Sequence, residues 1–146
     1  MSALFEHSPW VEARTDARPS SGDRHADLMA VVHRATPEEQ LALIRAHPEL
    51  AGKAAVDGSL TEASAAEQAS AGLDRLTQAE FDRFHALNAA YREKFGFPFI
   101  ICVRLTDKAG ILAAMERRLA NDRDAEIATA LEQIGEIVRL RLEDMA

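Results

Sequence analysis

Residues 77–96 read TQAEFDRFHALNAAYREKFG, and this stretch decides the fold class. Thr77 followed three residues later by Glu80 is a capping box, a pairing that begins helices. Gly96 is the residue type that most often ends one. Between them, large apolar side chains and one amide recur at a helical spacing of three or four residues: Phe81, Phe84, Asn88, Tyr91 and Phe95. The stretch therefore predicts an amphipathic helix from Thr77 to about Phe95.

Asn88 interrupts the apolar stripe of this helix. A buried amide must be hydrogen-bonded, so we expect Asn88 to hold a neighbouring loop, and we prefer that role to a catalytic one.

The same helical periodicity runs through most of the chain, whereas the strict alternation of half-buried strands is almost absent. We therefore predict an all-α, single-domain bundle of seven to eight helices over residues 1–146. Further helices are expected at about residues 2–5, 9–16, 22–34, 37–46 and 60–70, followed by one capped by Asp107 and a last one capped by Asn121 or Asp122. The apolar run 97–103 has no second strand to pair with, so it should be an extended buried loop. A polar ligand could satisfy some of its backbone donors.

Composition narrows the functional classes. A chain of 146 residues can bury about two thirds of its unfolded surface without metals or disulfides. The single cysteine, Cys102, excludes an intrachain disulfide and is interpreted as a small buried hydrophobe in preference to a nucleophile. With 24 acidic and 17 basic residues, the net charge of −7 argues against a general nucleic-acid or membrane binder. The sequence shows no membrane-spanning run and no secretory signal, so the expected location is the cytoplasm.

One histidine stands at a helix end. Thr36 and Glu39 form another capping box, and Pro48 should end the helix at about Ala46 because the residue before a proline avoids helical geometry. His47 then lies just beyond the last turn, where the helix dipole favours the imidazolium form. This position suits a proton donor or an anion partner, although a capping or packed core histidine is an open alternative.

A polar helix face follows. Ser59 with Glu62 forms a third capping box, which predicts a helix that carries Ser64, Glu67 and Gln68 on one side. The face could be solvated surface, or it could present a carboxylate and an amide to a ligand rich in oxygen and nitrogen.

The last helix carries an arginine on its apolar face. The residues that share this face are Ile127, Leu131, Ile134, Val138, Arg141 and Met145. A guanidinium among apolar side chains is costly unless a buried carboxylate or an anionic ligand pairs with it, or unless its head reaches solvent.

Motifs for metals and nucleotides are missing from the sequence. The five histidines show no HExxH spacing, and there is no CxxC, glycine-rich phosphate loop or GxSxG motif. Catalysis would therefore use acid–base and electrostatic groups, with no metal and no cofactor.

Taken together, several segments closely resemble the 2-oxo-4-hydroxy-4-carboxy-5-ureidoimidazoline (OHCU) decarboxylases, in this order and over nearly the whole chain. The segments are residues 5–10 (FEHSPW), 47–53 (HPELAGK), 64–68 (SAAEQ), 70–73 (SAGL), 87–91 (LNAAY) and 94–99 (KFGFPF). One difference is Ala51, which stands between Leu50 and Gly52 where some family members run directly from leucine to glycine.

The resemblance implies an all-helical homodimer that converts OHCU to (S)-allantoin and carbon dioxide in urate degradation without a cofactor. It implies catalytic roles for His47 and Glu67. The implied substrate contacts are Pro48, Ser64, Gln68, Phe99, Ile100, Ile101, Cys102, Val103 and Arg141. Two other classes stay open: a non-catalytic helical module that binds ureide-like compounds, and a helical metal hydrolase, which the histidine spacing disfavours.

Overall fold

The computed structural model describes residues 4–5, 8–47, 50 and 62–145. These residues form seven α-helices, one 3₁₀ turn and no strand, which confirms the all-α prediction. The elements are α1 (Trp10–Asp16), α2 (Arg24–Arg34), α3 (Pro37–Arg45), α5 (Glu62–Ser70), α6 (Gln78–Phe95), η1 (Val103–Leu105), α7 (Lys108–Arg118) and α8 (Arg123–Met145).

The predicted caps set several helix ends. In α3, the Thr36 side chain accepts from the Glu39 backbone N–H while the Glu39 carboxylate accepts from the Thr36 N–H. Thr77 and Glu80 repeat this reciprocal pair at the start of α6. Gly96 ends α6 in the left-handed region with φ of 80°, a conformation that only glycine adopts without strain.

The structure places two predicted helix starts, at α2 and α8, and two others lie wholly or partly outside the described residues. α2 begins at Arg24, two residues late, because Asp23 occupies the capping position and accepts from the Ala26 N–H. The last helix takes Asp122 as its cap, which accepts from the Ala125 N–H at 2.8 Å. Leu4 and Phe5 form a turn where a short helix was expected, and residues 2–3 lie outside the described part. The capping box predicted at residue 59 also lies outside it, and α5 is described from residue 62.

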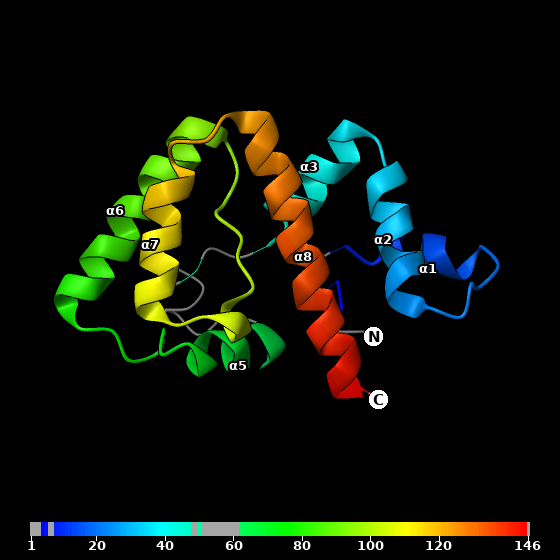
Figure 1. Ribbon diagram of the computed structural model, residues 1–146, viewed down its shortest axis with the longest axis horizontal. Coiled ribbons are helices and arrows are strands. Elements are labelled where there is room, and N and C mark those ends of the chain that lie inside the picture. The colour runs from blue at the N-terminus through cyan, green and yellow to red at the C-terminus, as the bar shows by residue number, and fades with distance from the viewer. Residues whose placement is uncertain (1–3, 6–7, 48–49, 51–61, 146) are drawn as a thin grey trace.

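Helix α8 runs through the middle of the molecule. In Figure 1, α6 and α7 lie side by side to one side of it, while α1, α2 and α3 lie to the other. α5 lies below α7 in this view and packs against η1. The inward face of α8 is closely packed, because Ala130, Ile134 and Val138 are all at most 1% exposed.

The segment 97–103 is extended and passes between α7 and α8 (Figure 1). Its side chains are mostly buried, and the Phe99 ring meets Tyr91 of α6 edge-on at a centroid distance of 5.3 Å. The prediction of an extended buried loop is confirmed. The 3₁₀ turn η1, which begins at Val103, was not predicted.

Candidate active site

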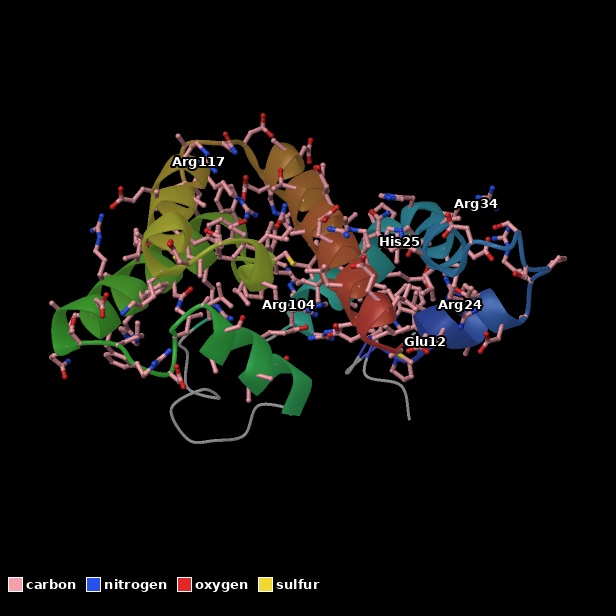
Figure 2. All side chains as sticks on the ribbon, turned by 60° about the horizontal axis from the view of Figure 1, so that its bottom comes forward. Glu12, Arg24, His25, Arg34, Arg104 and Arg117 are labelled. Carbon is pink, nitrogen blue, oxygen red and sulfur yellow. The ribbon has the colours of Figure 1, made fainter. Side chains whose placement is uncertain are left out.

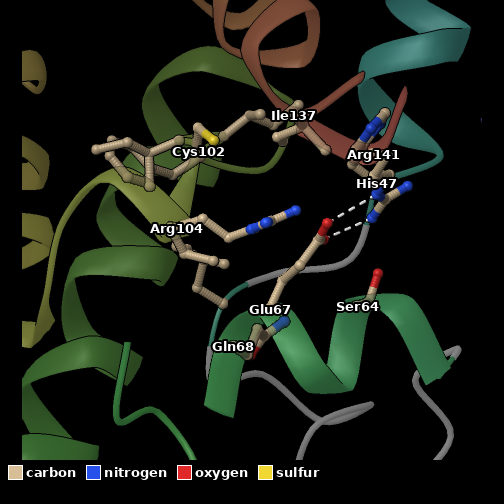
Figure 3. Close-up of a pocket in the computed structure, with 13 residues that line it drawn as sticks. His47, Ser64, Glu67, Gln68, Cys102, Arg104, Ile137 and Arg141 are labelled. Atoms are coloured by element: carbon tan, nitrogen blue, oxygen red, sulfur yellow. Dashed lines mark hydrogen bonds and ion pairs between the residues drawn. The ribbon is translucent and has the colours of Figure 1, made fainter. Parts of the chain in front are cut away.

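One pocket gathers residues from the end of α3, from α5, from the second half of α8 and from the segment 97–103. Its unfilled space is about 470 Å³, counting the part open to solvent. The lining residues are His47, Leu50, Ser64, Glu67, Gln68, Phe99, Ile100, Ile101, Cys102, Val103, Arg104, Ile137 and Arg141. Figure 3 shows this pocket with α5 below it and α8 above it.

His47 enters from the end of α3. The helix ends at Arg45, and the His47 backbone N–H donates to Ile44 O at 3.2 Å, so the residue lies just past the last turn as predicted. Its ring Nδ1 lies 3.0 Å from the Leu43 carbonyl oxygen. Because a carbonyl oxygen only accepts, Nδ1 carries a hydrogen, and Nε2 is the nitrogen that gains or loses a proton.

Glu67 and Arg141 join α5 to α8 across the pocket. The Arg141 Nε donates to Glu67 at 2.8 Å and Nη2 donates to the other carboxylate oxygen at 2.6 Å. The two side chains are only 9% and 14% exposed, and the dashed lines in Figure 3 mark the pair. A bidentate pair of this kind fixes both groups in orientation as well as charge. The buried arginine of the last helix therefore has a buried carboxylate as its partner.

The polar face of α5 is not a solvated surface. Ser64 is 6% exposed and Gln68 is 5% exposed, although both are polar, and both line the pocket with Glu67. A buried polar face is stable when its groups have partners, and a cavity between polar groups is where a polar ligand can provide them.

The segment 97–103 is held from both sides. Arg118 of α7 donates through Nη1 to the Ile100 carbonyl oxygen at 2.7 Å, and the Cys102 N–H donates to the Gln133 side chain of α8 at 2.9 Å. The backbone N–H and C=O of Ile101 make no hydrogen bond to another described residue. Its peptide groups are therefore available to a ligand at the pocket wall.

Cys102 is 2% exposed, and burial raises the pKa of its thiol while the nearby Glu67 charge raises it further. The thiol is thus neutral at physiological pH, as expected for a small hydrophobe and not for a nucleophile.

Asn88 of α6 holds Leu50, which lies three residues after His47 in the sequence. Its Nδ2 donates to the Leu50 carbonyl oxygen at 2.8 Å, across 38 residues of sequence, which confirms the predicted tethering role. The contact holds Leu50 at the pocket wall.

The pocket brings together every predicted site residue that the structure describes; Pro48 lies outside the described residues. Three lining residues were missed, namely Leu50, Arg104 and Ile137. Leu50 lies inside the motif that begins at His47, which was a usable signal. Arg104 lies in the unpredicted 3₁₀ turn, which is too short for a sequence pattern to show which of its side chains face the pocket.

In the described part of the chain, no group of three histidine, cysteine, aspartate or glutamate side chains lies close enough to hold a metal ion.

The fold and the pocket define a small all-helical protein whose cavity combines a histidine, a carboxylate and guanidinium groups with an apolar wall. A family model described as OHCU decarboxylase matches residues 1–143. The 2-oxo-4-hydroxy-4-carboxy-5-ureidoimidazoline decarboxylase of Haloferax volcanii is 42% identical over 144 residues, covering 97% of this chain and 83% of that protein. The mouse (Mus musculus) protein of the same name is 37% identical over 145 residues, covering 97% and 82%.

A solved structure supports the same relationship. A crystal structure of (S)-allantoin synthase matches with a TM-score of 0.70 at 32% identity, covering 97% of this chain and 46% of that one. The chain belongs to the OHCU decarboxylase family.

Proposed function

We propose that this protein decarboxylates OHCU to (S)-allantoin and carbon dioxide in the breakdown of urate, using no cofactor. Family membership supports the reaction class, and it favours catalysis over a non-catalytic ureide-binding module. The observation that carries the assignment to this pocket is the convergence of His47, which follows α3, with Glu67 of α5 and Arg141 of α8.

The substrate's own ring explains how the reaction proceeds with side chains alone. When the bond to the carboxylate breaks, its electron pair forms a double bond to the neighbouring ring carbon, and the adjacent ring imine nitrogen accepts the displaced electrons and a proton. The resulting enol becomes a ring carbonyl when its hydroxyl gives up its proton and a proton reaches the ring carbon that bears the ureido group. The protein has to orient the substrate and to control the face on which this proton arrives.

His47 is assigned the proton transfer. Its Nδ1 is engaged by the Leu43 carbonyl, so the ring has a fixed orientation and Nε2 is its exchangeable position. Such a fixed ring transfers a proton to one face of a bound ligand, which would give the S product.

Glu67 and Gln68 are assigned to the hydroxyl and ureido groups, with Ser64 beside them on α5. The bidentate bond from Arg141 fixes the Glu67 carboxylate, which leaves its remaining lone pairs aimed consistently at the substrate. Arg141 thus contributes charge balance and positioning, and the pocket has a defined polar wall.

The peptide groups of 99–103 are assigned to the edge of the substrate ring, with the Ile101 N–H and C=O as the main donor and acceptor. Phe99, Ile100, Cys102 and Val103 shape the apolar side of the same wall. Pro48 is assigned a position beside the substrate because it follows His47 directly in the sequence.

The assembly and location follow the same family reasoning. We propose one domain over residues 1–146, a homodimer and a cytoplasmic location. In the described part of the chain, no helix is long and apolar enough to cross a membrane. Recovery of the protein in a membrane fraction after cell lysis would contradict the location.

The activity is tested by forming OHCU in situ from urate with urate oxidase and 5-hydroxyisourate hydrolase. Adding the protein should greatly speed the appearance of (S)-allantoin, followed by circular dichroism. A slow, racemic decay that the protein leaves unchanged would refute the proposed activity.

A further inference from the structure

An outer groove shares its inner wall with the pocket. The groove is lined by Ala66, Glu67, Ser70, Arg104, Arg141, Asp144 and Met145. Three of these, Glu67, Arg104 and Arg141, also line the pocket, so charged side chains form the boundary between groove and pocket. In Figure 3 the Arg104 guanidinium points toward the same space as the Glu67 carboxylate.

The two arginines at this boundary are held in different ways. Arg141 pairs with the buried Glu67, and it also donates to the Leu4 carbonyl. Arg104 pairs with Asp144 at 2.7 and 3.2 Å, and that aspartate is 59% exposed while the Arg104 side chain is 29% exposed. Solvent screens an exposed pair, so Arg104 can exchange its partner at low cost whereas Arg141 cannot. Figure 2 labels Arg104 beside the lower part of α8.

The charge of the pocket makes such an exchange useful. The chain carries a net charge of −7, which repels an anionic substrate at long range. Among the described residues that line the pocket, Glu67 and Arg141 pair with each other, and Arg104 pairs with Asp144, which lines the groove but not the pocket. A carboxylate that enters from the groove reaches the Arg104–Asp144 pair at this boundary and can take the place of Asp144 on the guanidinium.

We propose that Arg104 is the substrate-capture residue, which releases Asp144 and pairs with the carboxylate of the incoming substrate at the boundary between groove and pocket. The proposal rests on the proposed function, since it takes the substrate to be a carboxylate-bearing ureide.

Capture at the entrance has a specific kinetic signature. A guanidinium that stayed on the reacting carboxylate would stabilise the ground state and slow the loss of carbon dioxide, because that loss removes the negative charge it binds. Arg104 therefore acts on the substrate before the chemical step. Its removal should raise KM and leave kcat nearly unchanged.

The test compares Arg104→Gln with Arg139→Gln in the OHCU assay. Arg139 is the matched control, because it lies on α8, pairs with the half-buried Glu136 and the exposed Glu143, and does not line the pocket. We expect Arg104→Gln to raise KM about 10-fold with kcat within about twofold, and Arg139→Gln to change neither. An unchanged KM, or a loss confined to kcat, would overturn the capture role.

Calorimetry separates this proposal from the proposed function. The probes are allantoate, a ureide carboxylate, and (S)-allantoin, which is neutral. Arg104→Gln should weaken allantoate binding about 10-fold and leave (S)-allantoin binding within about twofold. Equal losses for both probes would refute capture by charge even if turnover is normal, whereas a wild-type protein that turns over no OHCU would refute the proposed function.

A second variant keeps the test decisive if Arg104→Gln does not fold. Asp144→Asn removes the competing carboxylate, so allantoate binding should tighten about twofold or more. Weaker binding of allantoate by Asp144→Asn would overturn the exchange of partners.

Discussion

Arg141 is a charged side chain that lies buried at the pocket wall. It lies on the apolar face of α8, is 7% exposed, and its charge is balanced by Glu67 through two hydrogen bonds. Removing one partner of such a pair leaves an uncompensated buried charge, which typically costs about 3–5 kcal/mol. The pair is therefore both a structural contact between α5 and α8 and the feature that orients the pocket carboxylate.

Arg141→Lys tests the orienting role with the charge retained. Lysine cannot reproduce the planar, two-pronged contact, so the Glu67 carboxylate should lose its fixed direction. We expect kcat/KM for OHCU to fall about 100-fold, the scale of a misplacement of about 1 Å. Arg139→Lys on the same helix is the control and should be neutral. Wild-type kcat/KM in Arg141→Lys would show that the bidentate geometry is unimportant.

At the scale of elements, the loop between α6 and α7 depends on a buried polar network. Arg118 stacks on Phe99 at 4.3 Å and donates both to the Ile100 carbonyl and to Glu126. Glu126 is fully buried and also accepts from Tyr91 at 2.5 Å and from Asn121 at 2.9 Å. Burial raises the pKa of Tyr91, so its hydroxyl remains a donor. The network thus fixes the backbone that faces the pocket.

Arg118→Lys should separate loop position from folding. The lysine can still neutralise Glu126, but it cannot also reach Ile100 and stack on Phe99. We expect a folded protein with kcat/KM reduced about 10-fold. Tyr91→Phe is the matched comparison, because it removes one bond to Glu126 and leaves the Ile100 contact; it should lose about 1–3 kcal/mol of stability and keep its kcat/KM. If both variants lose only stability, the loop does not depend on Arg118 for its position.

Helix ends could be predicted from the sequence where residues close in the chain set them. Capping boxes at Thr36 and Thr77, the glycine at residue 96 and the caps at residues 107 and 122 each act within four residues, so their ends were placed closely. The buried position of Arg141 also followed from periodicity, because α8 is long enough to define one face.

Other site features depend on contacts between distant segments. Arg118 follows Ile111 and Met115 at helical spacing on α7, so the rule that identified Arg141 could have identified it; its partners, 8 and 18 residues away, could not be read from the pattern. Arg104 becomes a pocket residue because the 3₁₀ turn packs against α5 and because the Arg104 side chain pairs with Asp144 of α8. Tertiary packing decides such positions, and local propensity does not.

At the scale of the whole molecule, the pocket is assembled from both ends of the sequence. His47 belongs to the first third of the chain and Arg141 to the last helix, with α8 passing between the two halves of the bundle (Figure 1). The site therefore exists only in the complete fold. The largest exposed apolar side chains, among the described residues, are Leu105 at 57% and Met145 at 63%.

The proposed homodimer makes a direct prediction about mass. Sedimentation equilibrium should give twice the chain mass of 16.0 kDa at micromolar concentration. A mass of one chain over the full concentration range would contradict the assembly while leaving the pocket and its chemistry unaffected.

The most direct test of the central claim is circular dichroism during urate breakdown, with OHCU generated in situ and wild type compared with His47→Ala. His33→Ala, which alters an exposed histidine of α2, is the control for the substitution. We predict a rapid (S)-allantoin signal with wild type and His33→Ala, and only slow racemic decay with His47→Ala, while the helical signal of all three proteins stays the same. Near-normal turnover by a folded His47→Ala protein would remove His47 from the mechanism and contradict the account of this pocket.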